Sequence, residues 1–473
     1  MSSVATGVHL HEDRLLPSAP EVRAIAREIH AAVRDLPVLS PHGHVDAALL
    51  LEDRPFRDAT SLLVSKDHYV TRLLHAAGVP LDRLGVGRDD LDEAEARAAW
   101  RLLCEHWDVF RGTPVAYWTT YVLTEVFGLD RRPSAGSADD LFDGVQDALA
   151  RPEFRPRSLF RRFGIELLAT TDDPADDLAA HAALAADPAW DGRVVPTFRP
   201  DRYLEPAAPG WVDAVTALGA VADVDTRTWP GWVAAMERRR AVFRAHGAVS
   251  ADHSHADVRA YPLGDEEAAR VYRDAVAGTV TPAAALALRG HMLLEMARMS
   301  ADDGLTMTLH TGVRRGHHPP TTRRFGPDTG HDVPAAAEFT DALAPLLERF
   351  GTDPGFTVVL FSLDEATYAR DVAPLAGFYP SVYAGAPWWF YDAPDAIRRW
   401  RDAVTETAGF RKTAGFVDDT RAFCSIPARH DMSRRMDAGH LARLVAEHRL
   451  ELDEAVDTAV DLVVGRPREV FGL

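Results

Sequence analysis

Eight short apolar runs recur along the chain, and each ends in polar residues that are capable of chemistry. The stretches between them, such as 281–300 and 393–407, are rich in Ala, Leu and Arg with the 3.6-residue period of helices. Eight strands alternating with helices are what a closed parallel barrel needs. We therefore predict an α/β fold, a (β/α)8 barrel of the TIM type, with strands within 37–46, 164–173, 193–201, 247–255, 305–312, 357–365, 381–390 and 411–421.

The gap between the first two runs is too long for a single crossover helix. Residues 47–163 fill it and include an aromatic-rich piece, 104–121, and a helical piece, 137–150. Long insertions at the C-terminal face of a barrel usually shape the active site. We predict one domain over 1–473, with a large, mostly helical insertion at about 47–163 that packs over the barrel mouth.

Charge and cysteine content narrow the class of protein. The 473 residues carry a net charge of -19, whereas nucleic-acid binding demands a basic surface. Cys104 and Cys424 are the only cysteines, which excludes a cysteine-based zinc site and argues against a disulfide. No stretch approaches the roughly 20 apolar residues of a membrane span, and residues 1–20 lack a signal-peptide pattern. We expect a cytoplasmic enzyme with no nucleic-acid or membrane partner, and a homo-oligomer is the general expectation for such enzymes.

A His-x-His pair and a distant carboxylate predict a metal site. His42 and His44 follow the first run, where alternate side chains share one side of an extended segment. Asp419 lies near the end of the last run, and barrel closure brings the first and last strands together. His310 ends the fifth run, so it is either a further ligand, a substrate contact or a packed histidine.

The scarcity of lysine limits this site to one ion. Two-metal barrel hydrolases commonly bridge their ions with a carbamylated lysine from a central strand. Lys66 and Lys412 are the only lysines, so no such bridge is available. Imidazole and carboxylate ligands favour Zn²⁺, with Mn²⁺, Fe²⁺ and Co²⁺ as alternatives. We predict a single divalent ion.

Three arginines follow predicted strand ends and favour an anionic substrate. Arg199, Arg315 and Arg421 each lie just after a run. A guanidinium group is planar and binds a carboxylate through two parallel hydrogen bonds. The alternative, in a chain so rich in arginine, is that they are ion-paired surface residues.

Other candidates carry more than one interpretation. His68 and Tyr69 can both donate and accept protons near the barrel mouth. Trp388 and Trp389 end the seventh run and are either core residues or an apolar floor for a sugar ring. The run 252–255, Asp-His-Ser-His, is a second His-x-His, with a structural role or a place in the pocket wall equally open.

Several motifs along the chain are similar to those of one known family. They are Asp67-His68-Tyr69, Thr170-Thr171-Asp172-Asp173-Pro174, Phe198-Arg199-Pro200-Asp201, His310 to Arg315, Gly326-Pro327-Asp328-Thr329-Gly330, Trp388-Trp389-Phe390 and Asp419-Thr420-Arg421. From about residue 35 onward the chain resembles the uronate isomerases, also called glucuronate isomerases, of the amidohydrolase superfamily. It departs from them around His42, where Ser40-Pro41 replaces Asp-Tyr, and at 316–320, where members often have an Asn-rich stretch.

The resemblance implies an aldose–ketose isomerase. It would interconvert D-glucuronate with D-fructuronate, and D-galacturonate with D-tagaturonate, by moving a proton between C2 and C1. Asp419 is then the first choice for carbon-proton transfer, and Tyr69 and His68 are candidates for hydroxyl-proton transfer. Two other classes stay open: a mononuclear metal-dependent hydrolase acting on another sugar acid, and a catalytically inactive sugar-acid-binding protein.

Overall fold

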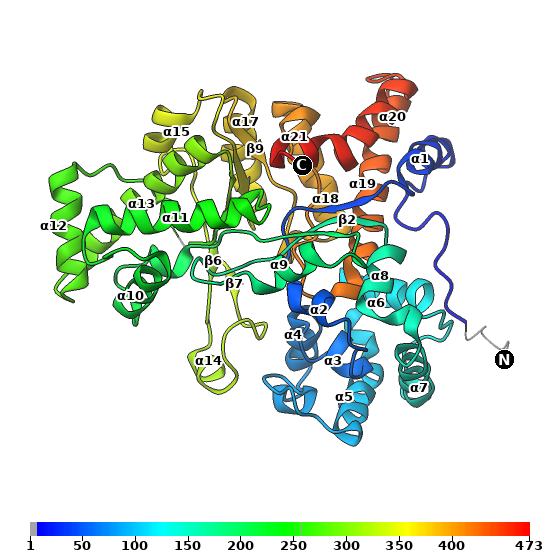
Figure 1. Cartoon of the computed structure of the whole chain (residues 1–473). Helices are drawn as coiled ribbons and strands as arrows, with labels where there is room; N and C mark the ends of the chain where they lie inside the picture. Colours follow the sequence, from blue (N-terminus) through cyan, green and yellow to red (C-terminus); the bar gives the residue numbers. More distant parts are fainter. Residues whose placement is uncertain (1–6, 256) are drawn as a thin grey trace.

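Two parallel sheets form the centre of the fold. The computed structural model describes residues 7–255 and 257–473 (Figure 1). One sheet has the strand order β1-β2-β3 and the other β4-β5-β8-β9, and all neighbouring strands are parallel. The strands are β1 (Val38–Ser40), β2 (Ile165–Ala169), β3 (Arg193–Val195), β4 (Ser250–His253), β5 (Thr306–His310), β8 (Val358–Phe361) and β9 (Val382–Ala384).

Backbone contacts join the two sheets beyond the ends of the regular strands. Phe198, just after β3, donates its N–H to the carbonyl of Ser250, and its own carbonyl accepts from Asp252 at 2.9 Å. On the far side of the second sheet, Ala414 donates to the carbonyl of Ala384 at 3.1 Å. The predicted α/β fold with parallel strands is thus confirmed.

The first seven predicted runs each contain one of these strands, but the eighth does not. The segment 411–421 starts within a 3₁₀ turn, Phe410–Lys412, and makes a single β-bridge at Thr413. Gly415 then adopts a left-handed φ of 77°, which interrupts an extended strand. The prediction of a regular strand over 411–421 was therefore wrong, and the segment pairs in parallel with β9 only through the bridge between Thr413 and Ala384.

Helices fill the long gap between β1 and β2. They are α2 (Ala47–Glu52), α3 (Ala59–Leu63), α4 (His68–Ala76), α5 (Glu93–Glu105), α6 (Pro114–Tyr121), α7 (Ala138–Leu149) and α8 (Pro156–Arg162). In α7, Leu141, Phe142, Val145 and Leu149 are buried, because this spacing places them on one helix face. These helices share a hydrophobic core with α19 (Ile426–Ala446), and Figure 1 shows α3 to α7 gathered in blue and cyan beside it.

The remaining helices surround the sheets or pack on other helices, as α1 (Pro20–Val33) and α20 (Leu452–Val460) do on α19. The 281–300 pattern becomes α13 (Pro282–Asp303), which starts at the N-cap hydroxyl of Thr281 and stops at Gly304, with a φ of 77°. None of the described helices is both long and apolar enough to cross a membrane. The others are α9 (Ala179–Ala186), α10 (Trp211–Ala222), α11 (Trp229–Ala245), α12 (Asp265–Val276), α15 (Ala344–Phe350), α16 (Glu365–Thr367), α17 (Ala373–Phe378), α18 (Pro394–Ala408) and α21 (Arg466–Phe471).

A long excursion follows β5. It contains the antiparallel pair β6 (Val313–Arg314) and β7 (Val333–Pro334), with α14 (Pro319–Phe325) between them. In Figure 1, α14 extends away from the sheets on the same side as α4. The excursion was not expected from the periodicity, because strands of two residues leave almost no pattern.

Candidate active site

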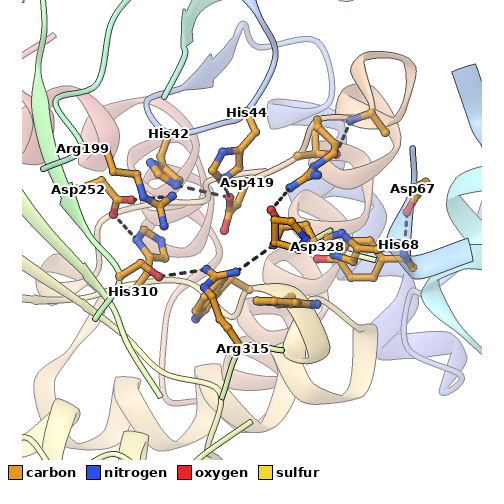
Figure 2. Close-up of a pocket in the computed structure, with 18 residues that line it drawn as sticks. His42, His44, Asp67, His68, Arg199, Asp252, His310, Arg315, Asp328 and Asp419 are labelled. Atoms are coloured by element: carbon orange, nitrogen blue, oxygen red, sulfur yellow. Dashed lines mark hydrogen bonds and ion pairs between the residues drawn. The ribbon is translucent and has the colours of Figure 1, made fainter. Parts of the chain in front are cut away.

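One cavity of about 290 Å³ brings the predicted site residues together. Each of them lines it: His42, His44, His68, Tyr69, Arg199, His310, Arg315, Trp388, Trp389, Asp419 and Arg421. Figure 2 shows labelled residues that reach this cavity from segments far apart in the sequence: His42 follows β1, Arg199 follows β3 and His310 ends β5. Polar ends of parallel strands therefore meet here, as expected for the C-terminal edge of such sheets.

The centre of the cavity is a carboxylate held beside two imidazoles. Asp419 Oδ1 lies 2.9 Å from His44 Nε2 and 3.4 Å from His42 Nε2. The backbone N–H of His44 donates to the carbonyl of Thr420 at 3.0 Å, which ties the segments together. Asp419 has a left-handed φ of 42°, a conformation that non-glycine residues adopt mainly under local constraint.

The electrostatics of this centre favour an ionised Asp419. Burial opposes the charge, but His42 and His44 outweigh it and hold the pKa of the Asp419 carboxyl well below its usual value. Burial also opposes a charge on His42, yet Asp252 and Asp419 raise its pKa overall. At His44 burial dominates and lowers the pKa. Asp419 is thus a carboxylate at neutral pH.

A second buried pair orients His310. Its Nδ1 lies 2.6 Å from Asp252 Oδ1, which also accepts from the Thr308 hydroxyl at 2.7 Å. The His310 ring stacks on Phe361 at 3.9 Å and on His42 at 4.5 Å between centroids. A carboxylate at Nδ1 fixes the tautomer and leaves Nε2 free to act as a ligand.

The donor atoms around Asp419 fit a divalent ion. His42, His310 and Asp419 each offer one ligand atom, and these atoms all lie within 4.8 Å of one another. Among the described residues, His42 Nδ1 and His310 Nε2 are buried without a hydrogen-bond partner. His44, which the sequence places in the ligand set, contacts Asp419 but lies outside this group of three.

The three arginines have different surroundings. Arg199 lies between two carboxylates, with Nε 2.9 Å from Asp201 and Nη1 3.3 Å from Asp252. Arg315 and Arg421 instead share Asp328, at 3.1 Å and 3.3 Å. Arg199 is therefore built into the wall of the site, whereas the other two face its open side.

His68 and Tyr69 begin α4, where Asp67 is the N-cap. The Asp67 carboxylate accepts from the N–H of Tyr69 at 2.9 Å, and the His68 and Tyr69 rings stack at 4.7 Å. The guanidinium of Arg429 packs 5.0 Å from the Tyr69 ring and pairs with Asp392. Burial lowers the pKa of His68 to about 3, and it also raises the pKa of Tyr69. Both side chains are therefore neutral at pH 7.

The tryptophans line the cavity from beyond the strand predicted to carry them. β9 ends at Ala384, and Trp388 and Trp389 follow in a loop and a 3₁₀ turn. Trp388 packs edge-on against His310 at 4.9 Å, and Trp389 lies 5.3 Å from His68. They form an apolar wall between the group of His42, His310 and Asp419 and the start of α4.

Asp252 and Asp328 are site residues that the sequence reasoning did not select. In the run 252–255, Asp252 and Ser254 line the cavity, while His253 hydrogen-bonds to the carbonyl of Thr308. Side chains alternate between the two faces of an extended segment, so Asp252 and Ser254 point into the cavity while His253 points to the opposite face. That period was the available signal for Asp252; the motif containing Asp328 was recognised, but its position on a loop gave no such signal.

Comparisons with known proteins agree over almost the whole chain. The family model for glucuronate isomerase matches residues 15–469. A uronate isomerase from Cutibacterium acnes is 52% identical over 464 residues, covering 98% of this chain and 98% of the relative. One from Corynebacterium efficiens is 48% identical over 471 residues, covering 99% of this chain and 100% of the relative.

Solved structures point to the same family. The crystal structure of a glucuronate isomerase from Caulobacter crescentus has a TM-score of 0.96 and 44% sequence identity, covering 98% of this chain and 97% of that one. The match therefore includes the segments that carry the cavity as well as the insertion between β1 and β2. On these grounds the chain belongs to the glucuronate isomerase family.

Proposed function

We propose that this enzyme is an aldose–ketose isomerase that interconverts D-glucuronate and D-fructuronate, and D-galacturonate and D-tagaturonate. The observation that carries the proposal is the ionised, buried carboxylate of Asp419 inside a cavity edged by arginines. Family membership supports the same reaction. A hydrolase has no feature of the cavity in its favour over an isomerase.

Asp419 is the proposed base for the carbon proton. It would take the proton from C2 of the open-chain aldose and return it to C1 of a cis-enediol, so that one group serves one face of the substrate. The Asp419 side chain is only 8% exposed where it faces the cavity. The neutral Tyr69 and His68 are proposed to carry the proton between O1 and O2.

The arginines are proposed to hold the negative charges of the substrate. Arg315 and Arg421 face the open side of the cavity and suit the carboxylate at C6. Arg199 lies on the side of Asp252, near the reacting end, and suits the oxygen that gains charge in the enediol. Binding the remote carboxylate would orient C1 and C2 against Asp419.

A single divalent ion, Zn²⁺ in the first instance, is proposed at His42, His310 and Asp419, with His44 at its edge. When bound, such an ion polarises a carbonyl oxygen. Neither lysine lines the cavity: Lys66 pairs with Asp89 and Lys412 donates to the carbonyl of Pro380. The surroundings of both lysines therefore support one ion in place of a bridged pair.

The domain organisation is part of the same proposal. The bridges at Phe198 and Thr413, with the hydrogen bond from His44 to Thr420, support a closed (β/α)8 barrel. The shared core of α19 and the insertion helices supports one domain, with 47–163 as an embellishment of it. A closed barrel would account for the meeting of the first and last segments at the metal site.

Proton NMR with D-glucuronate in D2O, repeated with D-galacturonate, tests the function. Isomerisation predicts growth of the matching keto-uronate, with deuterium at the transferred position if the base exchanges with solvent. The product of an isomerase keeps the mass of its substrate apart from exchanged deuterium, whereas a hydrolase adds water. If metal-loaded enzyme forms neither ketose, the proposal is rejected.

Removal of His42 is expected to weaken metal binding. Wild-type enzyme dialysed against buffer should keep about one Zn²⁺ per chain, whereas His42→Ala should bind it at least about tenfold more weakly. Because metal binds the folded state, added Zn²⁺ should also raise the midpoint temperature of unfolding of the wild type but not that of His42→Ala. His75→Ala is the matched control, since His75 is exposed on α4 and, within the described residues, its ring hydrogen-bonds to the carbonyl of Val79 alone. Equal metal content in His42→Ala and wild type would exclude His42 as a ligand.

A further inference from the structure

One carboxylate spans the two arginines at the open side of the cavity. Asp328 Oδ1 lies 3.1 Å from Arg315 Nη1, and its Oδ2 lies 3.3 Å from Arg421 Nη2 (Figure 2). Each oxygen therefore serves a different guanidinium group. This is also how a carboxylate ligand would be bound between two arginines.

Asp328 reaches this position from a loop that is fitted tightly against α4. It lies between α14 and β7 and has a left-handed φ of 57°. At Gly330, with a φ of 92°, an added Cβ would lie 2.6 Å from the Cβ of Arg72. The close packing fixes the loop backbone beside the cavity, so exchange of the Asp328 carboxylate requires only a rotation of its side chain.

The two arginines depend on Asp328 to different extents. Arg315 also contacts Asp332 at 3.5 Å and the hydroxyl of Ser254 at 3.2 Å, and its guanidinium stacks near Trp389. Within the described ranges, Asp328 is the one ion-pair partner of Arg421. Loss of the Asp328 contact would leave Arg315 in place and Arg421 without a counter-ion.

These contacts are easily exchanged. The side chains are partly exposed, at 34% for Asp328, 40% for Arg315 and 38% for Arg421. Ion pairs with this much solvent contact contribute little to stability. By contrast, Asp252 is fully buried beside Arg199 and His310, so its pairs belong to the permanent wall.

We propose that Asp328 is a resident counter-ion of the substrate-carboxylate site, and that the carboxylate of a uronate displaces it from Arg421. The inference rests on the proposed function and adds a residue that sets how strongly the site binds anions. In the empty cavity Asp328 and Asp332 together balance the two positive charges of Arg315 and Arg421. A ligand must therefore place its carboxylate correctly to displace Asp328 from Arg421, and free inorganic anions displace Asp328 poorly.

Asp328→Asn tests this through two readouts. Binding of inorganic phosphate, measured by calorimetry, should become roughly three- to fivefold tighter, the range of one exposed ion pair. KM for D-glucuronate should fall by a similar factor. Asp89→Asn removes the same charge from an exposed residue that contacts neither arginine, and it should change neither quantity.

The direction of the change in KM and in phosphate affinity separates the possible roles of Asp328. A rise in KM would overturn the proposal, because Asp328 would then contact the substrate or hold Arg421 in its working position. The proposal would also fail if wild type and Asp328→Asn bound phosphate equally, or if neither bound it. Asp328→Ala repeats the test if the Asn variant unfolds. Failure of the wild type to convert either uronate would reject the proposed function instead, and the phosphate comparison would still decide the role of Asp328.

Discussion

Replacement of Asp419 by Asn is expected to lower kcat/KM for D-glucuronate by about 10²- to 10⁴-fold, the range for loss of a general base. The amide has the shape of the carboxylate but cannot accept the C2 proton. It also loses the charge that holds His42 and His44. Steady-state kinetics and loss of deuterium exchange at C2 are the measurements.

The control for this variant has to separate chemistry from metal binding. Metal content and circular dichroism are measured beside the kinetics, and Asp89→Asn serves as the exposed Asp-to-Asn comparison, with wild-type activity expected. Near-wild-type turnover by folded Asp419→Asn enzyme would remove Asp419 from the proposed mechanism, whatever its metal content.

Phe198→Ala should destabilise the protein by about 3–5 kcal/mol, the usual loss for a phenylalanine truncated in a core. Phe198 is fully buried, packs edge-on against Phe243 at 5.1 Å, and supplies the backbone bridge between the two sheets. The cavity left by its ring would loosen that junction beside Arg199. Urea denaturation followed by circular dichroism measures the change in unfolding free energy.

Phe378→Ala is the matched substitution on the surface. The Phe378 side chain is 75% exposed, so its loss should change stability by no more than about 0.5 kcal/mol. If Phe198→Ala and Phe378→Ala changed the unfolding free energy equally, packing of the Phe198 ring between the two sheets would not contribute to stability.

Much of the fold follows from local pattern. Buried parallel strands appear in the sequence as short apolar runs, and β5 and β8 are buried throughout. Helices such as α13 are marked by caps at both ends. The failure at 411–421 has a physical cause, since Gly415 must turn sharply where a Cβ would lie 2.5 Å from Pro467. A contact with a segment about fifty residues later leaves no local trace.

The site residues that lie at or just after the end of a strand were predictable from the sequence. His42, His310 and Arg199 all follow apolar runs, so the order of the runs alone is enough to expect that they converge. Asp328 lies on a loop whose path depends on its packing against α4, and its pairing with two arginines is a tertiary fact. His44 shows the finer limit, because its ring lies closer to Asp419 than that of His42, yet His42 rather than His44 forms the group of three with His310 and Asp419.

The hydrogen bond between His44 and Thr420 bears on how the protein is made. It joins the beginning of a 473-residue chain to a segment close to its end. A ribosome adds about 5–20 residues per second, so His42 and His44 wait for tens of seconds before Asp419 is synthesised. A product that terminates between residues 163 and 418 contains the sequence of the insertion helices and the paired imidazoles but lacks Asp419. Translation thus supplies Asp419 only about 375 residues after His44.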